Sequence, residues 1–283
     1  MGSTLIKNMK RYRIFGFDFD ALALQLTPEQ ESWEEEVKKK HQKAKQEIVN
    51  QLEAQYGLIS NDVKIYNFIE LGAKPFSILA YHNQFLRQIR DAFIMGGYYP
   101  ALTGSCALGE RILNHLILKL RDFYKDRDEY KKVYKQKSFD NWVLVINTLE
   151  SWNILLTEVA EDFRNLYEIR NDSLHFNIEI ENDVRSKSLA AVQLLQKIIG
   201  NQFSGVGKQP WLFVSDGEIY IKKEWENHPF IETVYIPNCR YVGYKHEIKG
   251  EYPRFNIVDE FEYSNQQLTD AEYVKHRRSR QNC

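Results

Sequence analysis

Apolar residues between positions 28 and 200 recur at three- and four-residue steps, with charged and polar residues between them. This spacing places the apolar side chains on one face of an α-helix, so it predicts a bundle of amphipathic helices. We expect five or six helices, at 28–56, 75–95, 102–120, 140–152, 155–175 and 183–199. The charged, lysine-rich stretch 125–138 is typical of a loop or a frayed helix.

Helix-capping and helix-ending residues indicate where these helices begin and stop. Thr27 suits an N-cap, Pro28 suits the first helical position, and Gln30 completes a capping box. Glycines predict the ends of three helices: Gly57, the pair Gly96 and Gly97, and Gly200.

The pattern changes after residue 202. Residues 203–210 have the Gly, Ser and Pro content of a linker, and β-branched and aromatic residues dominate the segments that follow, which favours strands. Asp216 and Gly217 separate two of these segments and indicate a hairpin turn. The strand-like segments are 211–214, 218–221, 230–236 and 254–258, with a further one at 13–23 near the N-terminus.

These patterns predict a mainly α fold, a helical bundle with a small C-terminal β-rich extension. We place the helical domain at 1–202, with its core at about 75–202, and the extension, which includes a basic tail, at 203–283.

Composition narrows the class of protein. The 283 residues contain 38 Lys and Arg against 39 Asp and Glu, so any nucleic-acid binding must come from a local basic patch. No run approaches the ~18 apolar residues of a membrane span, and the N-terminus lacks the pattern of a signal peptide. The three cysteines lie too far apart in sequence for a disulfide framework: Cys106, Cys239 and Cys283. We therefore expect a cytoplasmic protein without membrane association.

The segment 155–175 carries the candidate chemistry. Its apolar residues fall on one helical face: Val159, Phe163, Leu166, Tyr167 and Leu174. Arg170 lies on the same line, where a charge needs an acidic partner or a function, because burying an unpaired charge is costly. Asn171 and His175 lie one turn apart on a neighbouring polar line. A guanidinium, an amide and an imidazole at one helix end suit phosphate chemistry.

A second arginine and histidine at similar separation, Arg240 and His246, fall in strand-like sequence without a helical stripe. We interpret this pair as a chance match and expect that replacing His246 changes almost nothing. The helical placement of Arg170 and His175, with Asn171 directly after the arginine, distinguishes the first pair.

The run 170–175, Arg-Asn-Asp-Ser-Leu-His, resembles the Arg-Asn-x3-His signature of the HEPN superfamily (higher eukaryotes and prokaryotes nucleotide-binding). The segment 101–114 resembles the earlier HEPN helix that presents a polar residue towards the motif, and a further helix at 190–199 is also expected. The resemblance covers about 75–202. It implies a helical bundle that dimerises with its two motifs near the dimer axis. Many members are metal-independent endoribonucleases, and others are non-catalytic binding modules.

Carried over to this sequence, the resemblance implies that His175 is the general acid and base. Arg170 would hold the scissile phosphate and stabilise the charge of the transition state. Asn171 would orient His175 or donate to the phosphate. Glu110 is the candidate to neutralise or position Arg170, because it lies at the edge of the apolar stripe of its own helix. The alternative interpretation is that Glu110 is an ordinary surface carboxylate without such a role. The implied reaction is attack by an RNA 2′-hydroxyl on the adjacent phosphate, which leaves a 2′,3′-cyclic phosphate.

Two functions of different class follow. The first is a metal-independent endoribonuclease that acts as a toxin or antiviral defence effector, with an RNA substrate, a homodimeric assembly and an antitoxin or defence-system partner. The second is a non-catalytic HEPN-like dimerising scaffold or nucleotide- or RNA-binding module. We expect no cofactor and no metal for either.

Three other features of the sequence are weaker indications of function than the motif at 170–175. Asp18 and Asp20 resemble the nucleophile strand of haloacid-dehalogenase-like phosphatases, but the expected threonine and an alternating β/α pattern are missing. Three residues lack the spacing of zinc ligands: His82, Cys106 and His115. The basic tail 275–280 is typical of a solvated terminus, although it would also suit RNA phosphates.

Overall fold

The structure is a computed structural model, and it describes residues 9–15, 21–174, 183–206, 209–251, 254–263 and 266–281. The chain divides into two compact units. The helical unit is Asp18–Phe203, and the sheet unit combines Met1–Phe17 with Ser204–Cys283. None of the helices in the described part of the chain combines the length and apolar character that a membrane span requires.

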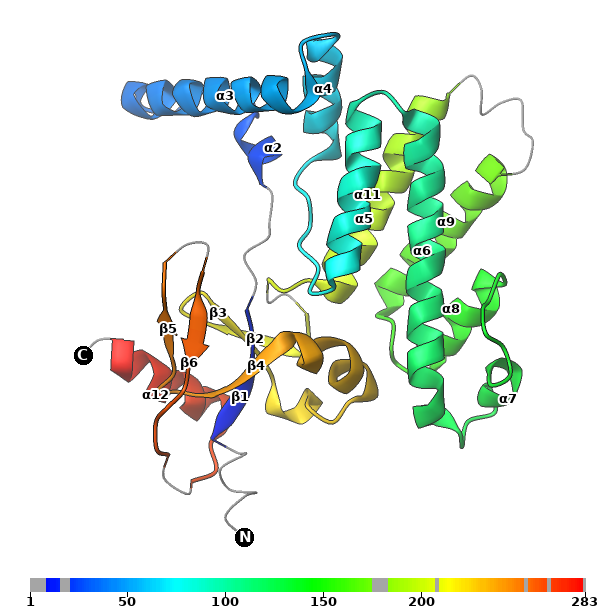
Figure 1. Cartoon of the computed structure of the whole chain (residues 1–283), viewed down its shortest axis with the longest axis vertical. Helices are drawn as coiled ribbons and strands as arrows, with labels where there is room; N and C mark the ends of the chain where they lie inside the picture. Colours follow the sequence, from blue (N-terminus) through cyan, green and yellow to red (C-terminus); the bar gives the residue numbers. More distant parts are fainter. Residues whose placement is uncertain are drawn as a thin grey trace. The chain divides into compact units, whose positions relative to one another are not determined.

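The helical unit is formed by helices and their connecting loops (Figure 1). They are α2 (Leu22–Gln25), α3 (Glu35–Tyr56), α4 (Asn61–Leu71), α5 (Ala80–Ile94), α6 (Tyr98–Leu120), the short 3₁₀ helix η1 (Arg121–Tyr124), α7 (Tyr130–Val133), α8 (Trp142–Ser151), α9 (Thr157–Leu174) and α11 (Val184–Phe203). The expectation of a mainly helical protein is therefore confirmed.

The central helix of this unit is α6, which packs against α5, α8, α9 and α11. Its sequence is apolar around most of its circumference, so neighbouring helices can cover it on several sides. Its buried residues include Leu102, Cys106, Leu113, Ile117 and Leu120. Burial of such side chains stabilises the fold by about 1.5–3 kcal/mol each.

The first long helix begins later than its capping signals predict. Residues 27–30 lie outside any helix, and α3 begins only at Glu35. The Thr27 hydroxyl instead donates to the carbonyl of Leu24 at 3.0 Å, so it closes the end of α2 rather than opening α3. Gly57, with φ at +77°, ends α3 as predicted.

Two further helices depart from their predicted boundaries. α5 begins at Ala80 rather than Pro75, because Asn83 holds the segment before it in a loop: its Nδ2 donates to the Ser77 carbonyl (2.6 Å) and its Oδ1 accepts from the Ser77 N–H (3.0 Å). α11 continues through Gly200, where the cost of a helical glycine, about 1 kcal/mol, is offset by the buried face of the helix.

The sheet unit contains a four-stranded antiparallel sheet in the order β2-β3-β1-β4. Its elements are β1 (Lys10–Ile14), β2 (Leu212–Ser215), β3 (Glu218–Ile221), the short helices η2 (Lys223–Trp225), η3 (Ile231–Tyr235) and η4 (Ile236–Asn238), β4 (Cys239–Gly243), β5 (Glu247–Lys249), β6 (Asn256–Val258) and α12 (Asp270–Gln281). The predicted hairpin between β2 and β3 is confirmed, with φ of +50° at Asp216 and +80° at Gly217.

The N-terminal strand changes the predicted domain boundary. Residues 1–202 are expected to form one helical domain, but β1 pairs with both β3 and β4 and is an inner strand of the sheet. The strand also lies earlier than the predicted segment 13–23. Arg11 and Arg13 are buried in it, so its burial cannot be recognised from an apolar pattern. The predicted boundary near residue 203 agrees with the division between the units.

Two segments of the sheet unit form helices that the sequence does not indicate. The expected strand at 230–236 contains η3, a π-helical turn. The ring of Trp211 lies 5.4 Å from that of Phe230 and 5.6 Å from that of Tyr235, and this packing overrides the strand preference of β-branched residues. The basic tail forms α12, in which Arg277 is buried, so it is not simply a solvated terminus.

Candidate active site at the end of α9

The structure brings three of the four candidate site residues together. Arg170 and Asn171 lie near the C-terminal end of α9, and Glu110 lies beside them on α6. The fourth, His175, lies outside the described residues, so its predicted role stays a prediction.

Arg170 forms an ion pair with Glu110. Its Nη2 lies 3.4 Å from Glu110 Oε2, and its Nη1 donates to Oδ1 of Asn171, also at 3.4 Å. The side chains of Arg170 and Glu110 are 23% and 36% exposed. A guanidinium carries five N–H donors, and within the described part of the chain Arg170 has one carboxylate partner. The partly exposed guanidinium of Arg170 can therefore be reached from solvent.

Trp142 joins these two residues, and the sequence analysis does not single it out. Its indole N–H donates to Glu110 Oε2 at 3.1 Å, and the guanidinium carbon of Arg170 lies 5.9 Å from its ring centroid. The side chain is buried, so its N–H needs an acceptor inside the protein. The sequence shows only that a buried tryptophan needs a hydrogen-bond acceptor for its N–H. It does not show that Glu110 is that acceptor.

Local hydrogen bonds fix the start of α8, where Trp142 stands. Asn141 is the N-cap, and its side chain accepts from the N–H of Leu144 at 3.0 Å. Asn114 of α6 holds Phe139, two residues before the N-cap, at both backbone groups: its Nδ2 donates to the Phe139 carbonyl (2.8 Å) and its Oδ1 accepts from the Phe139 N–H (2.7 Å). Asn114 therefore positions α8, and through it Trp142, rather than contacting Arg170.

Gly109 allows α6 to approach the helices that carry Arg170 and Trp142. A Cβ at this position would lie 2.7 Å from Leu166 Cδ2 and 2.9 Å from Trp142 Cη2. Both distances are too short for carbon atoms, so only glycine fits without movement of these side chains. The residue next to Glu110 thus sets the spacing of the site.

The buried thiol of Cys106 lies near enough to the guanidinium of Arg170 for that charge to affect its pKa. Cys106 lies one turn before Glu110 on α6 and is buried. Burial raises the pKa of the Cys106 thiol to about 11, although Arg170 acts in the opposite direction. The thiol is protonated at neutral pH, so Cys106 is not an activated nucleophile.

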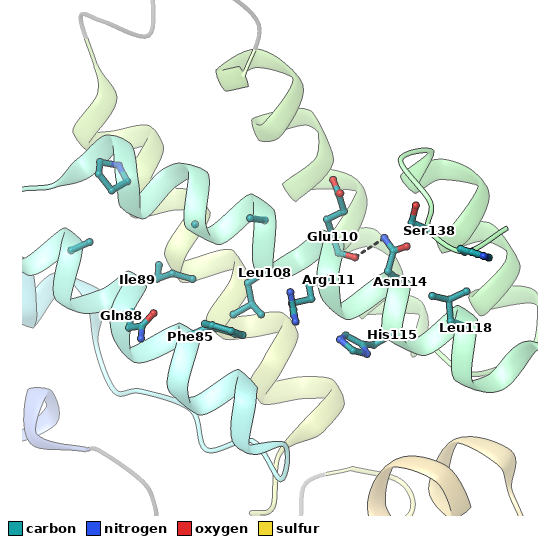
Figure 2. Close-up of a pocket in the computed structure, with 15 residues that line it drawn as sticks. Phe85, Gln88, Ile89, Leu108, Glu110, Arg111, Asn114, His115, Leu118 and Ser138 are labelled. Carbon is teal, nitrogen blue, oxygen red and sulfur yellow. Dashed lines mark hydrogen bonds between the residues drawn. The ribbon is translucent and has the colours of Figure 1, made fainter.

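The same glutamate lines a groove. A cavity of about 710 Å³ lies between α5 and α6, and Glu110 is one of its lining residues (Figure 2). Arg111 and His115 lie along it on α6, and Phe85 faces them from α5. The cavity falls within the usual size range of ligand-binding sites.

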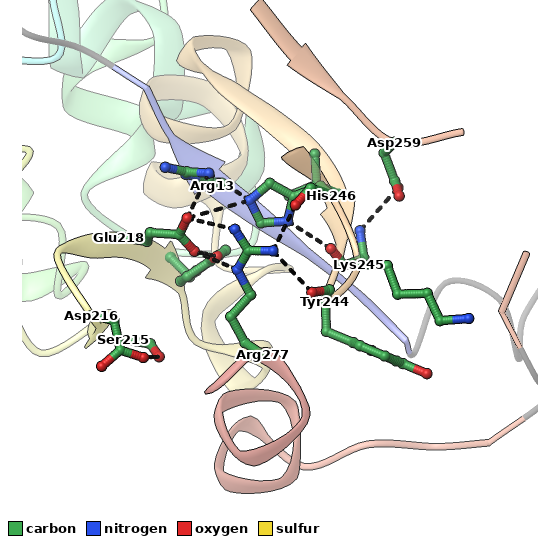
Figure 3. Close-up of polar contacts among 12 residues, drawn as sticks. Arg13, Ser215, Asp216, Glu218, Tyr244, Lys245, His246, Asp259 and Arg277 are labelled. Atoms are coloured by element: carbon green, nitrogen blue, oxygen red, sulfur yellow. Dashed lines mark hydrogen bonds and ion pairs between the residues drawn. The ribbon is translucent and has the colours of Figure 1, made fainter. Parts of the chain in front are cut away.

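A second group of charged side chains lies in the interior of the sheet unit (Figure 3). Glu218 of β3 accepts from Arg277 of α12 at both carboxylate oxygens (2.7 and 2.8 Å) and pairs with Arg13 of β1 at 3.0 Å. Tyr220 also donates to Glu218. These side chains are almost fully buried and bond to one another, so they hold α12 on the sheet and do not offer a binding surface.

His246 belongs to this buried group, so it contributes to the stability of the sheet unit, whereas the expectation that its replacement leaves RNA cleavage almost unchanged stays a prediction. Its ring is fully buried, its Nδ1 donates to the Gly243 carbonyl at 2.7 Å, and its Nε2 is hydrogen-bonded to Arg13. Burial, opposed in part by the bond to Gly243, lowers the pKa of His246 to about 4. Its role is structural, and Arg240 is exposed.

The remaining candidates of the sequence analysis do not form a site in the described part of the chain. His82 is buried, with its Nδ1 hydrogen-bonded to Ser77 Oγ at 2.9 Å. No group of three or more His, Cys, Asp or Glu side chains among the described residues is placed to hold a metal ion. Asp18 and Asp20 lie outside the described residues.

Comparison with known proteins finds no matching family model, no matching curated protein and no matching solved structure. The functional argument therefore stands on the geometry of the site and on the sequence motif.

Proposed function

We propose that the protein is a metal-independent endoribonuclease with its active site at the end of α9. The observation that carries this proposal is the partly exposed guanidinium of Arg170, held by Glu110 and Trp142 five residues before His175. The mainly helical fold around α6 is compatible with the HEPN-like assignment. A planar, fixed cation suits the binding of phosphate, and the sequence provides an imidazole for proton transfer five residues later.

The reaction is an intramolecular transfer at phosphorus. The RNA 2′-oxygen forms a bond to the adjacent phosphorus, its proton passes to a base, and the bond from phosphorus to the 5′-oxygen breaks as that oxygen receives a proton. His175 is the group that moves these protons. Arg170 stabilises the additional negative charge on the phosphoryl oxygens. Glu110 is a positioning residue, because it acts by orienting Arg170.

The active form is a homodimer with the ends of the two α9 helices near the two-fold axis. One arginine and one histidine form a small site, and a symmetric partner adds a second pair across an isologous interface. Toxin or antiviral activity, controlled by an antitoxin or a defence-system partner, is the biological role that fits such a nuclease.

One observation favours the alternative of a non-catalytic scaffold or RNA-binding module. Arg170 already has a carboxylate partner and an aromatic neighbour, as a purely structural arginine does. In that case the Glu110–Arg170 pair only links α6 to α9, and RNA is bound without being cleaved.

The test is incubation of the purified protein with bulk RNA in EDTA, followed by mapping of the new ends. The proposal predicts cleavage that leaves 2′,3′-cyclic phosphates, no cleavage of DNA of the same sequence, and a rate about 10²–10⁴-fold lower for His175→Ala with unchanged thermal stability. If the protein at micromolar concentration binds RNA but does not cleave it, the nuclease proposal fails and the non-catalytic alternative is supported.

A further inference from the structure

The groove between α5 and α6 is long compared with a small-molecule pocket. Its lining residues on α6 extend from Pro100 to Leu118, which at about 1.5 Å per residue is roughly 27 Å. On the other side it is lined by α5, from Phe85 to Ala92. A compact ligand would fill only a part of this length, so the shape favours an extended chain as the occupant.

The floor of the groove is apolar and made partly of small residues. Ala92, Gly104 and Ala107 keep it open, and Leu108 and Ile89 add larger apolar surface. Such a floor suits flat apolar faces, and unstacked bases have them. Paired RNA keeps its bases stacked inside the duplex, so an apolar floor favours a single strand.

Positive charge lies along one end of the groove. Arg111 and Lys137 line it, and within the described residues neither forms an ion pair with a carboxylate. The guanidinium carbon of Arg111 lies 5.5 Å from the centroid of the Phe85 ring, so a cation and an aromatic face occur together (Figure 2). This pairing of stacking surface and unpaired cations is typical of surfaces that bind single-stranded nucleic acid.

The charge around His115 also favours an anion. Burial, Lys119 and Arg111 all lower the pKa of His115, and the ring of Tyr81 lies 5.1 Å away. Among the described residues, Glu110 is the one acidic side chain that lines the groove, and its carboxylate already bonds Arg170 and Trp142. At this end of the groove, the basic side chains therefore attract a phosphate more strongly than the carboxylate of Glu110 repels it.

We propose that this groove binds the single-stranded RNA that flanks the phosphate held at Arg170. The proposal rests on the proposed function, and Glu110 connects the two places because it pairs with Arg170 and lines the groove. The bases lie on the apolar floor, and the phosphates lie against Arg111 and Lys137. The length corresponds to on the order of four nucleotides, which is the lower end of known single-strand site sizes.

The first test measures binding of a fluorescently labelled, 2′-O-methylated RNA 12-mer, which cannot undergo 2′-hydroxyl attack. The double variant Arg111→Gln, Lys137→Gln should bind at least tenfold more weakly than wild type, with a smaller dependence of affinity on salt. The matched control removes two exposed lysines of α3, Lys39→Gln with Lys45→Gln, and should retain wild-type affinity within about twofold.

The second test places a negative charge on the floor. Ala107 is exposed, so Ala107→Glu should leave the helix folded, since Glu is a good helix former. RNA affinity should fall at least tenfold, whereas Ala54→Glu, at an exposed position of α3, should not change it. Circular dichroism melts of both variants confirm that the fold is intact.

Equal RNA affinity for wild type and all groove variants would overturn the proposal. Loss of self-association by Ala107→Glu in sedimentation, with RNA affinity unchanged, would also overturn it and assign the groove to a second copy of the chain. If the groove binds RNA as predicted but natural RNA is never cleaved, the groove stands and the nuclease proposal fails. If RNA is cleaved and the groove variants cleave it normally, the groove proposal alone fails.

Discussion

At the residue scale, His246 links the stability of the sheet unit to pH. It is fully buried, and the charged and polar groups around it are Arg13 of β1, Glu218 and Tyr220 of β3, and Arg277 of α12. Burial lowers the pKa of His246 to about 4 in the folded protein, against about 6.5 in the unfolded chain. The unfolded state therefore binds more protons between these two values, and folding is favoured at the higher pH.

We expect the sheet unit to lose on the order of 3 kcal/mol of unfolding free energy between pH 7 and pH 4 from this group alone. Arg277, Tyr220 and Arg13 outweigh burial and hold the pKa of Glu218 below its usual value, so its contribution falls in the same direction at lower pH. Hydrogen exchange of β3 and β4, read by mass spectrometry, measures the effect. His246→Gln should flatten the dependence between pH 6.5 and 4, and an unchanged slope would show that another group causes it.

Trp142 makes a second residue-scale prediction. Trp142→Phe keeps an aromatic ring below Arg170 but removes the N–H that holds Glu110, and a hydrogen bond of this kind contributes about 1 kcal/mol. The rate of RNA cleavage should fall by roughly tenfold, because Arg170 is less well oriented.

The matched control for this change is Trp152→Phe. Trp152 is also buried and stands at the end of the same helix, but its ring stacks on Tyr124, away from Glu110. The Trp152→Phe variant should have a lower melting temperature than wild type, with little change in the rate of RNA cleavage. A similar loss of rate in both variants would mean that general destabilisation, not the bond to Glu110, explains the result.

At the element scale, the approach of α6 to α8 and α9 depends on one missing methyl group. Gly109→Ala places a Cβ within 2.9 Å of both Leu166 and Trp142, so the helices must separate or the side chains must move. Overpacking of this kind costs about 1–3 kcal/mol, and we expect that loss in chemical denaturation of the helical unit.

Gly104→Ala, five residues earlier on α6, is the comparison. Its Cβ would meet Cγ1 of Ile89 at 3.0 Å, so only one side chain, in the floor of the groove, would have to move. The expected loss is smaller than for Gly109→Ala. The reverse order would show that Gly109 is not the point of closest packing.

The helices of the core could be predicted because their apolar residues repeat with the helical period over many turns. α6, α8, α9 and α11 are of this kind, and each buries that face against another helix. α4 was missed because its 11 residues are too few to establish a period, and several apolar positions on it are exposed, including Val63 and Tyr66. The bounds of β1 were predicted too late in the chain, because two arginines are buried in it, which an apolar pattern cannot reveal.

The candidate site was predictable in part for a similar reason. Helical periodicity put Arg170 on the core-facing line and Glu110 at the edge of its own stripe, and the structure pairs them. Trp142 and Gly109 could not be found, because their roles depend on how closely α6, α8 and α9 approach one another. Such distances are properties of the packed helices, not of any one segment of sequence.

At the scale of the whole molecule, the proposed assembly makes a prediction of its own. Sedimentation at micromolar concentration should show a dimer, because a single Arg170 and His175 provide too few groups to surround an RNA strand. Cleavage activity should fall on dilution below the dissociation constant of that dimer. A monomer that cleaves RNA at full rate would contradict the symmetric arrangement.

The measurement that tests the central claim most directly compares two arginines of α9 on one labelled RNA. Arg164 stands on the same helix, is 33% exposed and is ion-paired with Glu150, but it is not part of the site. We predict that Arg170→Ala lowers the initial cleavage rate at least 10²-fold, that Arg170→Lys does not restore it, and that Arg164→Ala stays within about threefold of wild type. Equal rates for Arg170→Ala and Arg164→Ala would remove Arg170 from the mechanism and contradict the account.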